Sequence, residues 1–300
     1  MRNGERLAGI ENRKERFLLS ESSSSEIFEE QIVPYLFAGK VRSQRPKAIF
    51  VGGQPGSGKT PLLRYITEHE MELDNNFVEI NGDDFRAFHP EYTRLLDKDD
   101  QSAAFFTDLD SARWIEKSIA HAATIGCSVG IEGTLRQKEV VSKTSELFRA
   151  NGYDISLNVL LAHSLSSRLG IFERYLEQVK DSGSGRFTLR EAHDASYNAL
   201  PSTVEHLMRD SVVNEVNLFA RGGVKIGQWE LNEDEATSVR DQILQMIIDN
   251  RLEMPANEIS HIQNVLPRIK NELLVLEKVE MLKEIEVLEK DFLKFVSKDA

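Results

Sequence analysis

The chain has 300 residues, of which 40% are hydrophobic, and a net charge of −12 at pH 7. The acidic balance argues against a broad nucleic-acid surface, which would be basic, and no apolar run approaches the roughly 18 residues of a membrane span. Because the N-terminus also lacks the apolar core of a signal peptide, we expect a cytoplasmic protein. The single cysteine, Cys127, excludes an internal disulfide and is expected to be a buried structural thiol.

The first 25 residues are polar and contain a serine tract, so residues 1–25 are interpreted as a loose arm. Ser25 is expected to cap a helix over residues 26–37, with Ile27, Phe28 and Ile32 facing inward. We assign residues 26–250 to one α/β domain, which this helix opens.

The strongest motif follows directly. An apolar run at 49–51 predicts a strand, and an amphipathic segment at 62–70 predicts a helix. Between them the pattern G-x-x-x-x-G-K-[ST] is met by Gly53, Gln54, Pro55, Gly56, Ser57, Gly58, Lys59 and Thr60. Strand, glycine loop and helix together form the context of a P-loop, which binds phosphate through backbone N–H groups. We expect Lys59 to contact the β- and γ-phosphates and the Thr60 hydroxyl to hold Mg²⁺.

The rest of the domain alternates between strands and helices. Strands are predicted at 77–80, 128–131, 155–161, 216–219 and 224–226, and helices at 109–125, 140–150 and 165–179. This order predicts a mainly parallel sheet with helices on both faces. Ligands in such folds bind beyond the carboxyl ends of the strands, where the P-loop, Asp83 and Glu132 all fall.

Two acidic positions at these strand ends are candidates for chemistry. Asp83 could act as general base toward a hydroxyl nucleophile, although Asp84 competes for the role and either could be a turn or N-cap residue. Glu132 could be a Mg²⁺ ligand, a substrate contact or a solvated strand-end carboxylate. The residue pattern alone leaves these alternatives open.

Two arginines could offset the charge of a transferring phosphoryl group. Arg174 lies in a predicted helix and could equally belong to its solvated face. Arg186 follows a Gly-Ser-Gly segment of the kind that closes over phosphates. The histidines show no metal-binding spacing, so we expect them to be structural.

Residues 251–300 differ from the preceding domain and are predicted to be a helical C-terminal extension. From 259 to 296 the chain contains no glycine and only one proline, Pro267, and apolar residues recur every three or four positions. The phase shifts near Glu280, which indicates two helices or one broken helix. The pattern fits a hairpin packed on the domain equally well as a coiled coil between copies of the chain.

Several linked motifs resemble the zeta toxin family, the kinase half of epsilon/zeta and Pez-type toxin–antitoxin systems. The resemblance covers about residues 26–226 and includes, in order, F-E-E-Q-I-V-P-Y-L-F-A-G-K, G-G-Q-P-G-S-G-K-T, I-N-G-D-D-F-R-A-F-H-P, I-E-G-T-L-R, I-F-E-R-Y-L-E, R-F-T-L-R-E-A-H-D and N-L-F-A-R-G-G-V-K-I. The chain departs from the family at Asn81-Gly82, where Asp-Asn often precedes the catalytic aspartate. The helical extension lies outside the matched motifs.

The resemblance implies a kinase that phosphorylates a sugar hydroxyl of UDP-N-acetylglucosamine with ATP or GTP and Mg²⁺, which blocks cell-wall precursor synthesis. It implies that Asp83 is the base and Lys59, Arg174 and Arg186 hold the phosphates. It also implies that the nucleotide sugar is contacted by Glu116, Glu132 and Thr134. An antitoxin protein is the expected partner. The alternatives are a P-loop kinase of another UDP-sugar, a nucleoside, an antibiotic or a dinucleotide, or a nucleotide-dependent switch.

Overall fold

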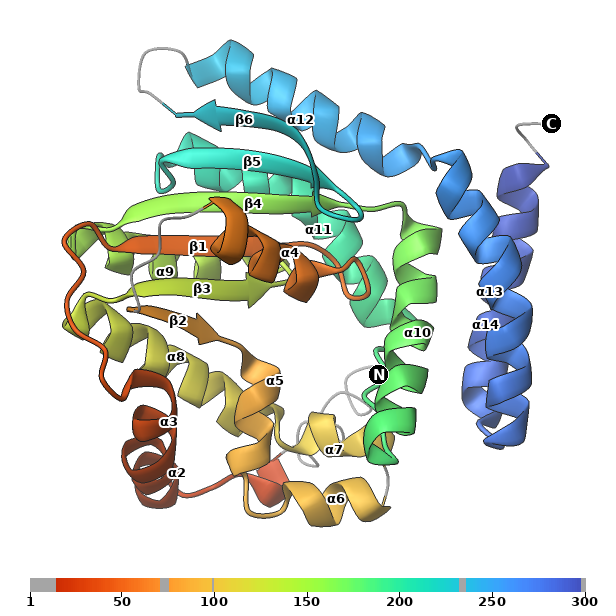
Figure 1. The fold of residues 1–300 in the computed structure, drawn as a ribbon, viewed down its shortest axis with the longest axis horizontal. Helices are drawn as coiled ribbons and strands as arrows, with labels where there is room; N and C mark the ends of the chain where they lie inside the picture. The colour runs from red at the N-terminus through yellow and green to blue at the C-terminus, as the bar shows by residue number, and fades with distance from the viewer. Residues whose placement is uncertain (1–14, 71–75, 99, 232–235, 298–300) are drawn as a thin grey trace, which may run out of the picture.

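The computed structural model describes residues 15–70, 76–98, 100–231 and 236–297 (Figure 1). In these residues six strands form one sheet in the order β2-β3-β1-β4-β5-β6. Neighbouring strands are parallel except for β5 and β6, which form an antiparallel hairpin at one edge. The strands are β1 Lys47–Gly52, β2 Phe77–Ile80, β3 Ser128–Gly133, β4 Asp154–Leu161, β5 Glu215–Ala220 and β6 Val224–Glu230. The predicted mainly parallel sheet is therefore confirmed.

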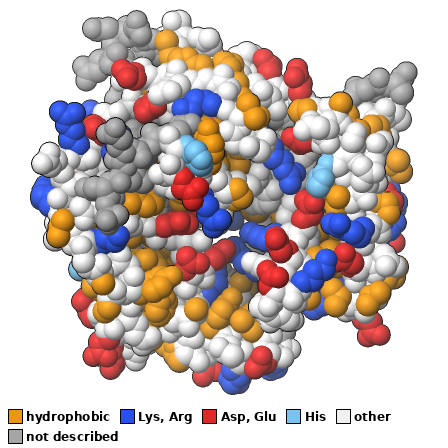
Figure 2. Space-filling model, viewed as in Figure 1, with side chains coloured by type: hydrophobic (Ala, Val, Ile, Leu, Met, Phe, Trp, Pro, Cys, Tyr) orange, Lys and Arg blue, Asp and Glu red, His pale blue; other side chains and the backbone are white. Residues whose placement is uncertain are grey.

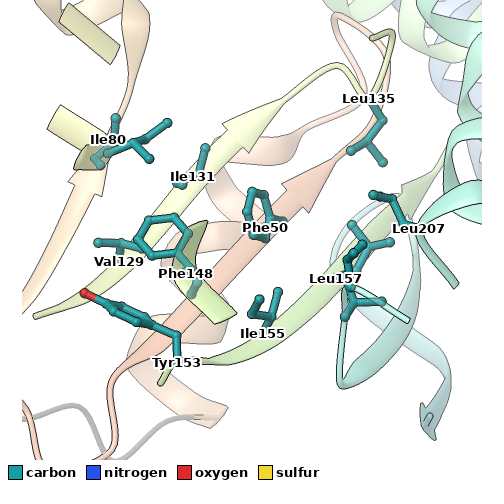
Figure 3. Packing of buried hydrophobic residues seen from close by; sticks show 14 of the residues in the cluster. Phe50, Ile80, Val129, Ile131, Leu135, Phe148, Tyr153, Ile155, Leu157 and Leu207 are labelled. Atoms are coloured by element: carbon teal, nitrogen blue, oxygen red, sulfur yellow. The ribbon is translucent and has the colours of Figure 1, made fainter. Parts of the chain in front are cut away.

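Helices cover both faces of this sheet, as the central strand β1 shows. Ala48 and Phe50 point into a large cluster, whereas Ile49 and Val51 point to the opposite side and pack against α4. Successive side chains of a strand point to opposite faces, so each face of β1 has its own apolar cover. The large cluster also contains side chains of α8 Asp108–Ile125, α9 Lys138–Ala150 and α11 Arg190–Arg209, on the face opposite α4 Lys59–Tyr65. Figure 3 shows Phe148 of α9 and Leu207 of α11 in this cluster.

The N-terminal helix begins earlier than the sequence predicts. Its first turn is capped by Ser20, whose hydroxyl accepts a hydrogen bond from the backbone N–H of Ser23 at 3.1 Å. Ser25 is not the cap; it lies inside the helix and receives a hydrogen bond from Lys117 at 2.8 Å. The segment runs through α2 Glu21–Ile27, a π-helical turn Phe28–Ile32 and α3 Val33–Phe37. The predicted arm lies outside the described residues up to position 14.

Short helices connect β2 to α8, and two longer helices were not predicted. The short ones are α5 Gly82–Phe85, a 3-10 turn Arg86–Phe88, α6 Tyr92–Lys98 and α7 Asp100–Phe106. The helices that sequence patterns missed are α11 and α12 Ala236–Leu252. Polar residues such as His193, Ser196 and Thr203 occupy buried positions of α11, and Pro201 lies inside it. These residues mask the apolar spacing by which a helix is recognised.

The C-terminal extension forms a helical hairpin on the side of α10 (Ser164–Ser182) that faces away from the P-loop (Figure 1). Its helices are α13 Ala256–Val275 and α14 Val279–Val296, which confirms the predicted break near Glu280. Their apolar seam forms a second buried cluster with side chains of α10. Of the two arrangements left open by the pattern, the structure shows the hairpin packed on its own domain.

Two expectations drawn from composition can be compared with the structure. Cys127 is fully buried, as predicted for a structural thiol. Within the described ranges, no helix combines the length and apolar character that crossing a bilayer requires.

Candidate active site

The P-loop adopts a backbone conformation that only glycine allows at two of its positions. Gly56 and Gly58 have φ angles of +75° and +104°. A Cβ atom on Gly56 would lie 2.0 Å from the backbone oxygen of Ser167, so the loop packs directly on the first turns of α10. Pro61 lies in the first turn of α4, where its missing N–H is not needed. The loop therefore leads from β1 into the N-terminus of α4, as a phosphate-binding loop must.

Buried hydrogen bonds anchor the loop from behind. The amide of Gln54 is fully buried and donates to the backbone oxygen of Ala162 at 2.8 Å and to the hydroxyl of Ser167 at 3.1 Å. The Ser167 hydroxyl also contacts Nε2 of His193 at 2.8 Å, and Nδ1 of His193 contacts Asp194 at 2.9 Å. This order resembles a nucleophilic triad. However, Ser167 is fully buried and already holds the loop, so the three residues support the P-loop.

Lys59 and Thr60 point from the loop into a group of charges. The ammonium group of Lys59 donates to the backbone oxygen of Gln54 at 3.1 Å, and the Thr60 hydroxyl donates to Oε2 of Glu132 at 3.0 Å. Burial lowers the pKa of Lys59 to about 8, although the nearby Glu132 carboxylate opposes this shift. Arg174 and Arg186 lower it further. A buried amine surrounded by cations is favourable for binding polyanionic phosphate, whose charge would restore the protonated form.

Asp83 lies opposite the P-loop, in the first turn of α5. Asn81 caps this helix by accepting the backbone N–H of Asp83 at 3.1 Å. The Asp83 carboxylate pairs with Arg186 and, at 3.4 Å, with Nε of Arg86. Burial alone would raise the pKa of Asp83, but these arginines outweigh it and hold the pKa below its usual value. Asp83 is thus the carboxylate that faces the cluster.

The competing carboxylate, Asp84, is exposed, as Asp83 is. Burial and the charge of neighbouring Asp83 raise the pKa of Asp84, and it makes no ion pair within the described residues. The two aspartates therefore differ in their charged neighbours, because only Asp83 pairs with Arg86 and Arg186.

Arg86 is a site residue that the sequence analysis missed. Its guanidinium is almost fully buried and donates to the backbone oxygen of Ala104 at 2.6 Å and to Thr107 at 3.2 Å, besides pairing with Asp108 at 3.2 Å. These contacts hold Arg86 in place, and its ion pair fixes the position of Asp83. The sequence feature that could have identified Arg86 is its spacing: it follows Asp83 by one helical turn, which places both side chains on one face.

Both predicted arginines reach the cluster. Arg174 does not lie on a solvated helix face. It donates to the Thr188 hydroxyl at 3.1 Å, and its buried Nε has no partner in the part of the chain that the structure describes. Burial and the charge of Arg186 lower the pKa of Arg174. Arg186 lies in the segment between α10 and α11, where its backbone N–H is held by Gln178 at 2.8 Å. The structure thus brings two guanidinium groups close enough for the charge of one to lower the pKa of the other.

Glu132 lies at the end of β3, beside the P-loop. One of its carboxylate oxygens accepts from Thr60, while the other is buried and has no hydrogen-bond partner among the described residues. Burial raises the pKa of Glu132, and the Thr60 hydrogen bond and Lys59 oppose that shift. No group of three or more protein ligands for a metal occurs in the described part of the chain. A P-loop needs none, because its Mg²⁺ takes most of its oxygens from phosphate and water.

The remaining two predicted residues do not join this cluster. Glu116 is exposed on α8 and has no hydrogen bond or ion pair with any described residue. Thr134 is half-buried directly after β3. The space-filling view shows a hollow at the centre of this face, bordered by acidic and basic side chains (Figure 2). Comparison with the ribbon places it between α5 and α10 (Figure 1).

Comparisons with known proteins show which family the chain resembles. The family model described as "Zeta toxin" matches residues 36–232. The chain is 32% identical to "Toxin zeta" of Enterococcus hirae over 192 residues, which is 64% of this chain and 66% of that toxin. It is 29% identical to "Toxin PezT" of Streptococcus pneumoniae serotype 4 over 210 residues, which is 70% of this chain and 82% of that toxin. The chain thus spans about two thirds of the first toxin's length.

A solved structure extends the similarity to the fold. It comes from a study of the PezAT chromosomal toxin–antitoxin system of Streptococcus pneumoniae, and superposes with a TM-score of 0.68 at 26% sequence identity. The alignment covers 86% of this chain and 98% of that one. The family match ends at residue 232, before α12 and the hairpin.

Proposed function

The chain belongs to the zeta toxin family, and we propose that it is a kinase that transfers the γ-phosphoryl group of ATP or GTP to a sugar hydroxyl of UDP-N-acetylglucosamine. Such a product would block the synthesis of cell-wall precursors and make the enzyme a toxin. The observation that carries the proposal is the placement of Asp83 opposite Lys59 and Thr60, with arginines on both sides. A switch protein would need a group that positions water, whereas in this proposal Asp83 is a base beside the hollow, where an acceptor could bind.

In this proposal Asp83 is the general base. It accepts the proton of the sugar hydroxyl while that oxygen forms a bond to the γ-phosphorus, and the bond from the γ-phosphorus to the leaving diphosphate breaks. Asp83 must first lose its ion pair with Arg186. Phosphate offers Arg186 a more highly charged partner, so donor binding would release the carboxylate and deliver the arginine in one movement.

The cations stabilise the phosphoryl group during transfer. Lys59 would hold the β- and γ-phosphates, and Arg174 and Arg186 would meet the equatorial oxygens, where negative charge persists in the transition state. Thr60, with Glu132 beside it, would hold Mg²⁺, which supplies charge neutralisation between the β- and γ-phosphates. The catalytic contribution of the protein is then mainly positioning and electrostatics.

The proposal also includes the binding of the acceptor substrate and a protein partner. We assign the nucleotide sugar to Glu116, Thr134 and Glu132. We also propose that a protein antitoxin restrains the kinase in its host, since the similar solved structure comes from a study of a chromosomal toxin–antitoxin system.

The test is direct. Purified protein is incubated with ATP or GTP, Mg²⁺ and a panel of UDP-sugars, nucleosides and sugars, and products are identified by mass. A gain of one phosphoryl group on UDP-N-acetylglucosamine, absent with Lys59→Ala, is the expected result. Phosphorylation of a different acceptor alone would replace the substrate, and nucleotide hydrolysis without any phosphorylated acceptor would contradict the kinase.

A further inference from the structure

A cavity of about 420 Å³ lies beside the P-loop and is not explained by the residues described above. One wall is formed by the start of α10 and by the turn between β5 and β6, and the other by α13 of the C-terminal hairpin. Its lining residues include Ser166, Arg221, Gly222, Glu258, His261 and Ile262. The family match ends before α13, so this wall belongs to the extension.

The cavity contains two planar side chains fixed in place by one carboxylate. Glu173 pairs with NH2 of Arg221 at 3.5 Å and with Nε2 of His261 at 2.7 Å. Arg221 also donates to the backbone oxygen of Ser166 at 2.6 Å. The guanidinium is therefore held by two partners and remains about a quarter exposed (23%). A fixed guanidinium plane is a stacking surface for an aromatic ring.

Two polar groups of the cavity have no hydrogen-bond partner among the described residues. Ser166 is 1% exposed, and one of these groups is its hydroxyl oxygen. The other is Oε2 of Glu258, which is also buried. Buried polar atoms are normally satisfied, so these two mark a site for a ligand. The Glu258 carboxylate would repel an anion and accept from N–H groups, which favours a neutral planar ligand that offers N–H donors.

The cavity is placed to receive one end of a nucleotide held by the P-loop. Ser166, Gly170 and Glu173 lie on one stripe of α10, and Arg174 of the phosphate cluster follows Gly170 by one turn. A Cβ on Gly170 would lie 2.3 Å from the backbone oxygen of Gly56 and 3.2 Å from NH2 of Arg221. The P-loop and the cavity wall thus meet across this glycine.

We propose that this cavity binds the base of the donor nucleotide, which stacks on Arg221 and donates its N–H edge to Glu258 of the C-terminal extension. The proposal rests on the function proposed above. It gives the extension a part in donor binding in addition to its packing on α10. Guanine presents two adjacent N–H groups to a carboxylate and adenine a single amino group, so Glu258 should hold guanine more firmly.

Calorimetry on the full chain separates the base from the phosphates. Binding of GDP, ADP and inorganic tripolyphosphate is measured for the wild type, for Glu258→Gln and for the control Glu253→Gln, an exposed glutamate just before α13. Glu258→Gln removes a hydrogen bond to a charged acceptor. Its affinity for GDP should therefore fall by about tenfold or more, and its affinity for ADP by less. Tripolyphosphate affinity should change less than about twofold in both variants, which also shows that the P-loop is intact.

Two results would overturn the assignment, and they differ from each other. If Glu258→Gln binds both nucleotides as tightly as the wild type, while Lys59→Ala loses them, the base lies elsewhere and the kinase proposal stands. If the wild type binds neither nucleotides nor tripolyphosphate, the P-loop does not bind a donor and both proposals fail. If Glu253→Gln weakens GDP equally, the effect of Glu258→Gln reflects the general charge of the extension, which also rules out a specific contact.

Discussion

Helix α10 separates two regions that are built in opposite ways. Toward the P-loop it presents Ser167 and Arg174, which belong to a network of charged and hydrogen-bonded groups. Toward the hairpin it presents Leu169 and Phe172, which belong to a mainly apolar cluster. Ion pairs of Arg168 with Asp291 and of Glu173 with His261 also join α10 to the hairpin. The charged side carries repulsive arginines and unpaired buried atoms that cost stability, whereas the apolar side contributes stability. The comparison suggests that the hairpin holds α10 in place against the cost of its active-site face.

Substitution of Asp83 should produce the largest loss of activity. This substitution acts on the charged side of α10 and should leave the apolar cluster of the hairpin unchanged. Asp83→Asn keeps the size of the side chain and loses the base, so kcat should fall by roughly 10²–10⁴-fold. Nucleotide affinity should change far less. Steady-state kinetics and a nucleotide titration measure the two quantities.

Asp84→Asn is the matched control, because Asp84 is adjacent, exposed and outside the cluster. Its kcat should stay close to that of the wild type. If Asp84→Asn were the inactive variant and Asp83→Asn the active one, the assignment of the base would be wrong by one residue.

The apolar side should respond in stability. Leu273 is fully buried in the hairpin cluster, whereas its neighbour Leu274 is 60% exposed. Leu273→Ala should lower the free energy of unfolding by about 2–5 kcal/mol, as buried leucines typically do. Leu274→Ala should leave it within about 0.5 kcal/mol of the wild type. Urea unfolding followed by circular dichroism measures both, and equal losses would mean that the hairpin does not pack as described.

How much of these regions could be read from the sequence depended on the kind of signal. The strand, glycine loop and helix of the P-loop were predicted, because the signals for this arrangement are local. The apolar seam of the hairpin was likewise predicted from the spacing of its residues, but the surface against which it packs was not. Whether Ile269 and Leu288 face α10 or another chain is decided by tertiary packing, which periodicity does not encode.

The remaining site residues show where local patterns stop. The pairing of Asp83 with Arg186 joins residues far apart in the chain, and only the resemblance to a family linked them beforehand. Arg86 was missed because a buried arginine near a carboxylate looks like any charged helix residue. Glu258 could not be recognised, because its significance lies in a cavity shared with α10 and the β5–β6 turn.

Replacing Arg174 or Arg186 by lysine tests the charged P-loop side of α10 without changing its net charge. Lysine cannot bind phosphate with two parallel N–H groups, so Arg174→Lys and Arg186→Lys should each lower kcat by roughly tenfold or more. Nucleotide affinity should fall less, since the lost contacts are strongest in the transition state. Arg268→Lys, whose side chain is exposed on α13, is the control. Equal losses in kcat and affinity would assign the arginines to ground-state binding.

The smallest effect concerns the protonation of Lys59. Because burial lowers its pKa to about 8, Lys59 is charged below that pH and loses its proton above it in the free protein. Bound phosphate favours the charged form, so binding above pH 8 requires uptake of a proton. ADP affinity should therefore be nearly constant from pH 7 to 8 and then decrease by up to about tenfold per pH unit.

The control is Lys59→Arg, because a guanidinium remains protonated throughout this range. Its absolute affinity will differ from that of the wild type, but its pH profile should stay flat up to about pH 9.5, below the titration of arginine. The charges of ADP do not change above pH 8, so any slope belongs to the protein. A flat profile for the wild type would show that Lys59 keeps its proton in the free enzyme, and that the neighbouring carboxylates Glu132 and Asp83 offset its burial more strongly than the surrounding arginines oppose it. The positive charge of Lys59 would then be balanced by its carboxylate neighbours before any nucleotide binds. The P-loop side of α10 would differ from the hairpin side in polarity, and not in unbalanced charge.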